Sequence, residues 1–298
     1  MSRKSDLLTL RAGRLVATVL PDLGGALGRF ATLTDVGAID WLRPAPEGAR
    51  SPLDCASFLA VPFFSRLQGD RLEFDGAIWP QRPAGWGFGH ALHGFGWQGP
   101  WQVVEARGDR VVLTRDHQGA DWPSAHEVRQ VIALAEDRLT VEVTLTNRGD
   151  RDMPAGVGFH PYFPRGQGFP RLTAQVAARH VTDASGWPIG AEADDPFVAA
   201  LRAGAAILTG QNSVYSGWNG HARLEWPHGD LRLGVSGPAA EFLCVYTPDG
   251  QDFACVEPVS HTIDAPNLPS AGFGPTGHRR LGPGERLVTA MVLRPSLA

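Results

Sequence analysis

The chain has little of what marks membrane, nucleic-acid-binding or disulfide-bonded proteins. No apolar run approaches the roughly 18 residues that a membrane-spanning helix needs. Three cysteines occur in 298 residues, at spacings that match no zinc motif, so we expect buried free thiols in a reducing compartment. The net charge is −4 and no basic stripe is present, which argues against nucleic acids and anionic membranes as partners.

The first residues also lack the pattern of a secretory signal peptide, because only a short apolar stretch separates Lys4 from Arg11. We therefore expect a cytoplasmic protein. Charged residues make up only 19% of the chain and hydrophobic residues 43%, which argues against disorder and allows a large core. The 36 glycines and 24 prolines, about a fifth of the chain, favour a turn-rich fold.

The main pattern in the sequence is an alternation of apolar and polar residues with a period of two. In residues 138–146, Leu139, Val141, Val143 and Leu145 share one face, while threonines and a glutamate share the other. This is typical of a half-buried strand. Similar units occur at 109–114, 127–134, 230–235 and 286–293, several of them directly after a Gly or acidic turn pair.

Helical patterns are weak, and the Ala-rich stretch 191–208 is interrupted by Asp194-Asp195-Pro196, so we expect short helices at most. The sequence predicts an all-β protein: one domain over residues 1–298, built as a large antiparallel β-sandwich. Loops rich in glycine, proline and tryptophan, among them 156–170 and 257–275, are expected to carry function.

A carboxylate closes an apolar strand near the C-terminal end. The predicted strand 253–256 ends in Glu257, and Pro258 is expected to stop it. A buried carboxylate is costly unless it is paired or functional. The alternatives are a catalytic role and a structural ion pair with an arginine.

Two histidines lie in aromatic and glycine-rich surroundings. His160 lies in Phe159-His160-Pro161-Tyr162, and an imidazole there could serve as acid or base or simply be a hydrogen-bonded core residue. In the segment 89–97, the glycines that flank His93 would let the backbone approach a ligand. A metal site at His90 and His93 is not expected, because on a strand the two would face opposite sides.

A sugar ligand would suit these aromatic and polar residues, since a sugar presents an apolar face to aromatic rings and a rim of hydroxyls to polar groups. Nine tryptophans are present, and Trp97 and Trp218 lie in the candidate loops. Arg66, amid apolar residues, must find acceptors, either a core carboxylate or sugar hydroxyls.

Taken in order, five motifs resemble those of the aldose 1-epimerase family, also called galactose mutarotases. They are Ser65-Arg66-Leu67, Leu92-His93-Gly94, Gly158-Phe159-His160-Pro161-Tyr162-Phe163, Tyr215-Ser216-Gly217-Trp218-Asn219-Gly220 and Val256-Glu257-Pro258. The resemblance spans residues from about 15 to 295. It implies a galactose mutarotase-like supersandwich with no metal or cofactor.

The resemblance also implies roles for single residues. Glu257 would be the base, His160 the acid and His93 an assistant at the ring oxygen or a neighbouring hydroxyl. Sugar hydroxyls would contact Arg66, and the other expected contacts are Asn212, Trp97, Tyr162 and Trp218. Asn212 stands where the family often has aspartate, and Ser65 where it usually has asparagine, which leaves the identity of the sugar open.

The implied activity is that of an isomerase that interconverts the α and β anomers of a free hexose or related aldose by ring opening. We expect attraction between His160 and Glu257 to raise the pKa of the imidazole and lower that of the carboxyl. The alternatives are a hexose 6-phosphate epimerase, with Arg66, Arg71 and Arg82 in one region, and a non-catalytic sugar-binding protein. The expected partner is a small-molecule sugar, and the expected state is a monomer or homodimer.

Overall fold

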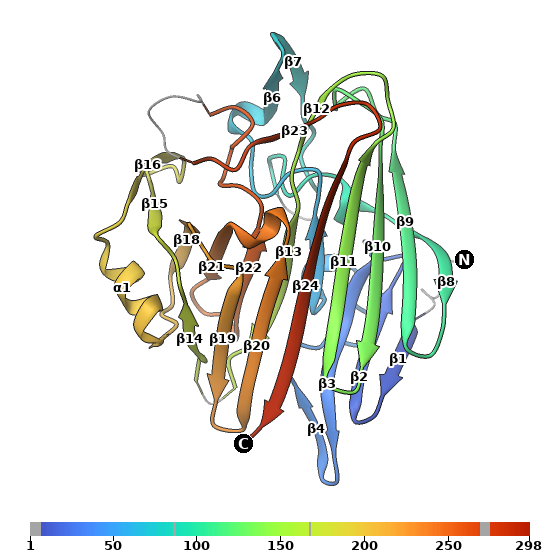
Figure 1. Ribbon diagram of the computed structural model, residues 1–298, viewed down its shortest axis with the longest axis vertical. Helices are drawn as coiled ribbons and strands as arrows, with labels where there is room; N and C mark the ends of the chain where they lie inside the picture. Colours follow the sequence, from blue (N-terminus) through green and yellow to red (C-terminus); the bar gives the residue numbers. More distant parts are fainter. Residues whose placement is uncertain (1–6, 86–87, 167, 269–274) are drawn as a thin grey trace.

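The computed structural model describes residues 7–85, 88–166, 168–268 and 275–298. Within these ranges the chain forms two large antiparallel sheets, two short two-stranded sheets and one α-helix (Figure 1). The predicted all-β antiparallel sandwich is thereby confirmed. None of the described helices is long and apolar enough to cross a membrane.

The larger sheet contains eleven of the described strands. Across the sheet the order is β1 (Leu8–Ala12), β2 (Leu15–Leu20), β3 (Ala26–Thr34), β5 (Ser57–Ala60), β13 (Gly158–Pro164), β22 (Phe253–Val259), β21 (Phe242–Thr247), β18 (Gln211–Ser216), β15 (Ala178–Thr182) and β16 (Pro188–Glu192), with β4 (Gly37–Asp40) paired to β3.

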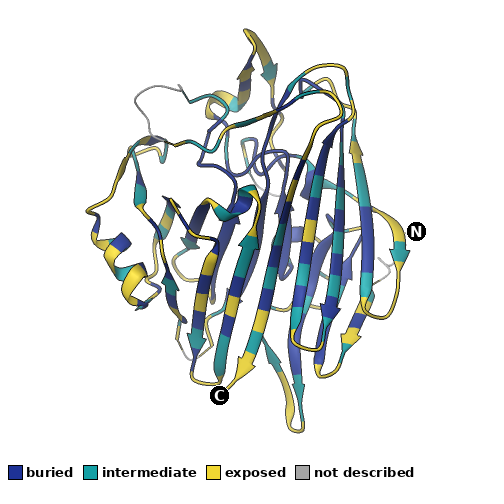
Figure 2. Cartoon of the chain, viewed as in Figure 1, coloured by how far each residue is buried: buried dark blue, intermediate teal, exposed yellow. Residues whose placement is uncertain are grey.

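The second sheet contains nine described strands. Their order is β17 (Ala205–Ala206), β14 (Arg171–Ala174), β19 (His221–Trp226), β20 (Gly229–Ser236), β24 (Arg286–Leu297), β11 (Arg138–Asn147), β10 (His126–Ala135), β9 (Arg110–His117) and β8 (Gln102–Ala106). The alternation seen in the sequence is realised here: Leu139, Val141, Val143 and Leu145 are all buried. Figure 2 shows the pattern as bands along β10, β11 and β24.

The remaining elements are short. They are the pairs β6 (Arg71–Phe74) with β7 (Ala77–Pro80) and β12 (Met153–Ala155) with β23 (Arg279–Leu281), the helix α1 (Pro196–Ala203), and 3-10 turns at Pro52–Asp54, Gln68–Asp70, Gly96–Gln98 and Pro238–Ala240. The helix begins at Pro196, capped by the Asp195 carboxylate, and ends at Ala203, where Gly204 caps it in a left-handed conformation. This agrees with the expectation of short helices at most, and Asp195 and Pro196, which interrupt the Ala-rich stretch, form the start of the helix.

The main hydrophobic core lies between the two large sheets. Ile132 and Val141 contribute from the nine-stranded sheet, and Phe159 and Val256 from the eleven-stranded sheet. The central strands β13 and β22 are buried on both faces, apart from the last residue of β13. Their other face is covered by residues of the segment 43–97 and carries the site described next.

Candidate active site

Two neighbouring strands at the centre of the larger sheet bring His160 and Glu257 together. Gly158 pairs with Val259 and Tyr162 pairs with Cys255. The same register places His160 of β13 directly opposite Glu257 of β22. Alternate residues of a strand face opposite sides, so both side chains point away from the core that their neighbours enter. Strand register therefore joins two residues that are 97 positions apart in the sequence.

The hydrogen-bond ladder between β13 and β22 opens at this point. No ladder pairs join Phe159–Pro161 to 256–258, although pairing resumes on both sides. Pro161 and Pro258 lack the backbone N–H that a ladder requires, which accounts for the gap. The expected strand end at Glu257 is wrong, because β22 continues through Pro258 to Val259. His160 likewise lies within a strand and not in a loop.

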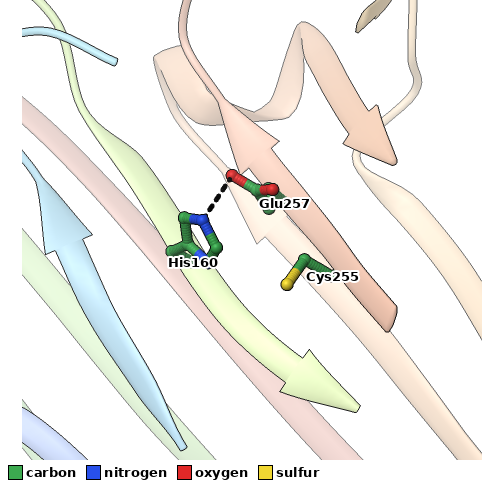
Figure 3. Close-up of side chains that lie close together, drawn as sticks. All are labelled: His160, Cys255 and Glu257. Carbon is green, nitrogen blue, oxygen red and sulfur yellow. Dashed lines mark ion pairs between the residues drawn. The ribbon is translucent and has the colours of Figure 1, made fainter. Parts of the chain in front are cut away.

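The two side chains are almost fully buried and line a cavity of about 480 Å³. His160 is 5% exposed and Glu257 is 2% exposed, and His160 Nε2 lies 3.5 Å from Glu257 Oε2 (Figure 3). The imidazole ring packs against two aromatic rings, with centroids 4.5 Å from Phe58 and 4.8 Å from Tyr162, and these two rings are themselves 6.3 Å apart. These two contacts restrict rotation of the imidazole, whose Nε2 faces the carboxylate.

Burial, not mutual attraction, sets the protonation of this pair. Loss of solvation raises the pKa of Glu257 well above its usual value, although a hydrogen bond from the Cys244 thiol opposes the shift. Loss of solvation also lowers the pKa of His160 to about 3. The expected directions were the reverse, and they are wrong because desolvation exceeds the attraction between the groups. Burial therefore favours a protonated Glu257 carboxyl group beside a neutral His160 imidazole.

His93 approaches the same cavity from the covering loop. Its ring centroid lies 5.2 Å from that of His160, in an edge-to-face arrangement. Its Nδ1 accepts a hydrogen bond from the backbone N–H of Ser65 at 3.1 Å. The neutral ring therefore carries its proton on Nε2. Burial lowers the pKa of His93 well below its usual value, so the ring is a neutral donor.

Close backbone contacts hold the loop that presents His93. Gly94 has φ +67°, and a Cβ atom there would lie 2.3 Å from the carbonyl oxygen of Val61. The indole N–H groups of Trp97 and Trp101 donate to the carbonyl oxygens of Leu92 and Gly96. His93 itself has φ +55°, a costly conformation for a residue other than glycine, and its surroundings enforce it.

The sequence as a whole matches a known family. A family model described as aldose 1-epimerase matches residues 6–294. The chain belongs to the aldose 1-epimerase family. It is 31% identical to the uncharacterized protein YphB of Escherichia coli (strain K12), over 97% of this chain and 98% of that protein.

Solved structures resemble this family member along its length. A crystal structure of an E. coli K12 protein, provisionally described as an aldose 1-epimerase, has a TM-score of 0.85 and 29% identity, covering 98% of this chain and 99% of that chain. A galactose mutarotase-like protein from Clostridium acetobutylicum has a TM-score of 0.83 at 18% identity, covering 97% and 95%, and shares the fold.

Three of the expected sugar contacts line the cavity of this aldose 1-epimerase family member. They are Arg66, Asn212 and Tyr162. Arg66 lies over the Trp187 ring at 4.8 Å and donates to the carbonyl oxygen of Gly186. His90, which a strand would have turned away from His93, also lines the cavity, because this segment forms a loop.

The two tryptophans expected at the sugar do not line the cavity. Trp97 is 0% exposed and stacks on Phe58, behind the cavity wall. Trp218 is buried in the main core, and its indole N–H donates to the carbonyl oxygen of His221. Placing Trp97 and Trp218 at the site was wrong, because both indoles are used in packing the fold.

Several lining residues were not recognised in the sequence. Arg43 lies over the rings of Tyr162 (4.1 Å) and Phe253 (4.6 Å) and donates to the backbone carbonyls of Leu53 and Cys55. Tyr246 also lines the cavity, since it follows Cys244 by two positions on the site face of β21. The feature of the sequence that could have drawn attention to Arg43 is Pro44, the residue that follows it.

One grouping of the described residues could hold a metal ion. Ligand atoms of His160, Cys255 and Glu257 all lie within 4.8 Å of one another (Figure 3). Imidazole, thiolate and carboxylate are groups that zinc accepts, but the thiol must first lose its proton. Burial raises the pKa of Cys255 well above its usual value, which opposes this loss. The three side chains thus include ligand types that suit zinc, while the protonated thiol opposes metal binding.

Proposed function

We propose that this protein is an aldose 1-epimerase, an isomerase that interconverts the α and β anomers of a free hexose or related aldose. The observation that carries the proposal is the buried pair of His160 and Glu257, 3.5 Å apart at a cavity of sugar size. The anomeric oxygen and the ring oxygen of an aldose are bonded to the same carbon. The acid and the base must therefore lie close together, as they do here.

Ring opening needs one proton removed from the anomeric hydroxyl and one delivered to the ring oxygen. In the proposed reaction, the Glu257 carboxylate takes the first proton and the His160 imidazolium gives the second. The product state has a protonated Glu257 and a neutral His160, which is the form that burial favours. Ring closure on the other face returns both protons, so the pair is regenerated.

A proton must move from Glu257 to His160 before a cyclic sugar can open. Nε2 and Oε2 are 3.5 Å apart and not hydrogen-bonded, so the two groups must first approach to hydrogen-bond distance. The number of protons in the pair does not change in this transfer. Sugar hydroxyls that donate to the carboxylate would favour its ionised form. His93, as a neutral donor, would bind the ring oxygen or an adjacent hydroxyl throughout the cycle.

Recognition of the sugar would fall to the polar residues around the pair. Arg66 and Asn212 would bind hydroxyls, while Tyr162 and Phe253 offer ring surface for the apolar face of a sugar. A free sugar would be the only partner that the reaction requires, with no cofactor.

The test is the rate at which a pure α-anomer equilibrates, followed by polarimetry. Glu257→Gln keeps the size and removes the base, so we expect turnover to fall by about 10²- to 10⁴-fold. Sugar binding, measured by calorimetry, should change little. An unaltered rate in this variant would contradict the assignment. Binding by the native protein without any acceleration would instead indicate a sugar-binding protein.

A hexose 6-phosphate is a second candidate substrate. Of the three arginines considered from the sequence, only Arg66 lines the cavity; Arg71 pairs with Glu73, and Arg82 is exposed. Arg43, however, also lines it, so two guanidinium groups are available, the minimum expected for a phosphate. Comparing kcat/KM for glucose and glucose 6-phosphate would decide between them.

A further inference from the structure

A buried histidine outside the cavity is tied to the cavity by the backbone. His261 follows β22 and is 3% exposed. Its Nε2 accepts the backbone N–H of Phe64 at 2.9 Å, and its Nδ1 lies 2.8 Å from Ser260 Oγ. Because Nε2 is an acceptor, the neutral ring must carry its proton on Nδ1 and donate it to Ser260. The same hydroxyl accepts the N–H of Val157.

The next backbone amide is held by a second histidine. The N–H of Ser65 donates to His93 Nδ1 at 3.1 Å, and the N–H of His93 donates back to the Ser65 carbonyl at 2.8 Å. Ser65 has φ +63°, a costly conformation for a residue other than glycine, which persists only where the surroundings impose it. Two successive amides thus connect His261 to His93.

We propose that His261 is a positioning residue, which holds the Phe64–Ser65 backbone so that His93 keeps its proton on Nε2 and presents it to the cavity. This inference rests on the proposed function for its effect on turnover. The tautomer of His93, however, is a property of the protein alone. Without the bond to His261, the Ser65 amide would no longer be aligned on Nδ1, and both tautomers of His93 would become accessible.

Two further hydrogen bonds join the segment that contains His261, after β22, to the segment that follows Phe64 and Ser65. The Asp264 carboxylate accepts the N–H of Gln68 at 3.0 Å, and the Asn267 side-chain oxygen accepts the N–H of Glu73 at 2.8 Å. Loss of the single bond from His261 to Phe64 should therefore misalign the segment without detaching it. A residue that served only to anchor this segment would be largely redundant with Asp264 and Asn267.

Two amide substitutions separate positioning from packing. In His261→Gln the side-chain oxygen can take the place of Nε2 and still accept the Phe64 N–H. In His261→Asn the oxygen reaches only the position of Nδ1, so the contact with Ser260 survives and that with Phe64 is lost. His180→Asn, at an equally buried histidine of β15, is the control for the cost of the replacement itself.

The readout is the tautomer of His93 in ¹⁵N-histidine-labelled full-length protein at neutral pH, with its signals assigned from His93→Gln. We expect the Nε2–H form in the native protein, in His261→Gln and in His180→Asn, and a mixture in His261→Asn. Turnover should fall about 10- to 100-fold in His261→Asn, mainly in kcat, and stay near the native value in the other two.

Two results would overturn the proposal: an unchanged Nε2–H tautomer in His261→Asn, or equal losses in His261→Gln and His261→Asn. If the native protein accelerates no mutarotation, the proposed function fails, while the tautomer comparison still decides the role of His261.

Discussion

The cavity contains two histidines that the fold holds in different ways. His160 lies within a central strand, against the rings of Phe58 and Tyr162, and no other described residue forms a hydrogen bond with its Nδ1. His93 lies on a loop in a left-handed conformation, and its Nδ1 is fixed by a backbone amide. The strand histidine faces a carboxylate at 3.5 Å, while the loop histidine faces no acidic partner at salt-bridge distance among the described residues.

Because of this difference in surroundings, the two histidines can do different chemistry: His160 can transfer a proton, whereas His93 can only donate a hydrogen bond. Under the proposed function, an imidazole beside a carboxyl group exchanges a proton with it. An imidazole whose acceptor nitrogen is already used can only donate, and burial keeps it neutral. Under the proposed function, His160 changes its protonation state in each cycle and His93 does not.

The largest expected effect is that of His160→Gln. Glutamine keeps hydrogen-bonding capacity but cannot transfer a proton, so turnover of a pure α-anomer should fall by about 10²- to 10⁴-fold in a polarimetric assay. Sugar affinity should stay close to that of the native protein.

His93→Gln provides the contrast, because the amide N–H can still donate to the sugar. We expect a smaller loss, about tenfold, since one donor is weakened and none of the proton-transfer steps is removed. Equal losses in the two variants would show that the histidines have equivalent roles and would remove the distinction drawn here.

Stability against pH should distinguish the two members of the pair. The folded pKa of His160, about 3, lies below its value of about 6.5 in the unfolded chain. Its contribution is therefore complete above pH 6.5 and is lost as the pH falls towards 3, at up to about 1.4 kcal/mol per pH unit. His126 and His261, also near 3, and His180, near 4, add to the same acid limb.

Glu257 should behave in the opposite way. Its folded pKa is raised, so its contribution is present at low pH and is lost as the pH rises above the unfolded value of about 4.3. Glu257→Gln should thus be more stable than the native protein at neutral and alkaline pH, while His160→Gln should flatten the acid limb. Urea unfolding from pH 4 to 9 measures both; a Glu257→Gln variant less stable at pH 8 would contradict the raised pKa.

The sequence predicted the fold better than it predicted the site. Strands such as β11, half-buried in the nine-stranded sheet, can be predicted from the alternation of apolar and polar residues. Their predicted limits differ from the observed ones by a few residues. Strands β13 and β22 are buried on both faces and show no such alternation, so His160 was assigned to a loop and Glu257 to a strand end.

The register between paired strands and the burial of side chains cannot be predicted from local sequence. That His160 faces Glu257 depends on pairing between distant strands, for which only the order of family motifs gave a sign. The protonation of His160 and Glu257 depends on how completely they are desolvated, and that depends on the segment 43–97, whose residues cover them. The tryptophans show the same limit, because an indole suits a sugar site and a core equally well.

The smallest expected effect on catalysis is that of Trp218→Phe. Trp218 packs in the main core, and its indole N–H satisfies the His221 carbonyl at 2.9 Å. Loss of that bond should reduce the free energy of unfolding by about 1–3 kcal/mol, whereas kcat and KM should not change, since no part of the indole lines the cavity. Arg66→Lys, at a residue that does line the cavity, should raise KM under the same assay. If Trp218→Phe raised KM as much as Arg66→Lys does, the turn between β18 and β19 would belong to the sugar site, and the boundary drawn between core and cavity would have to move.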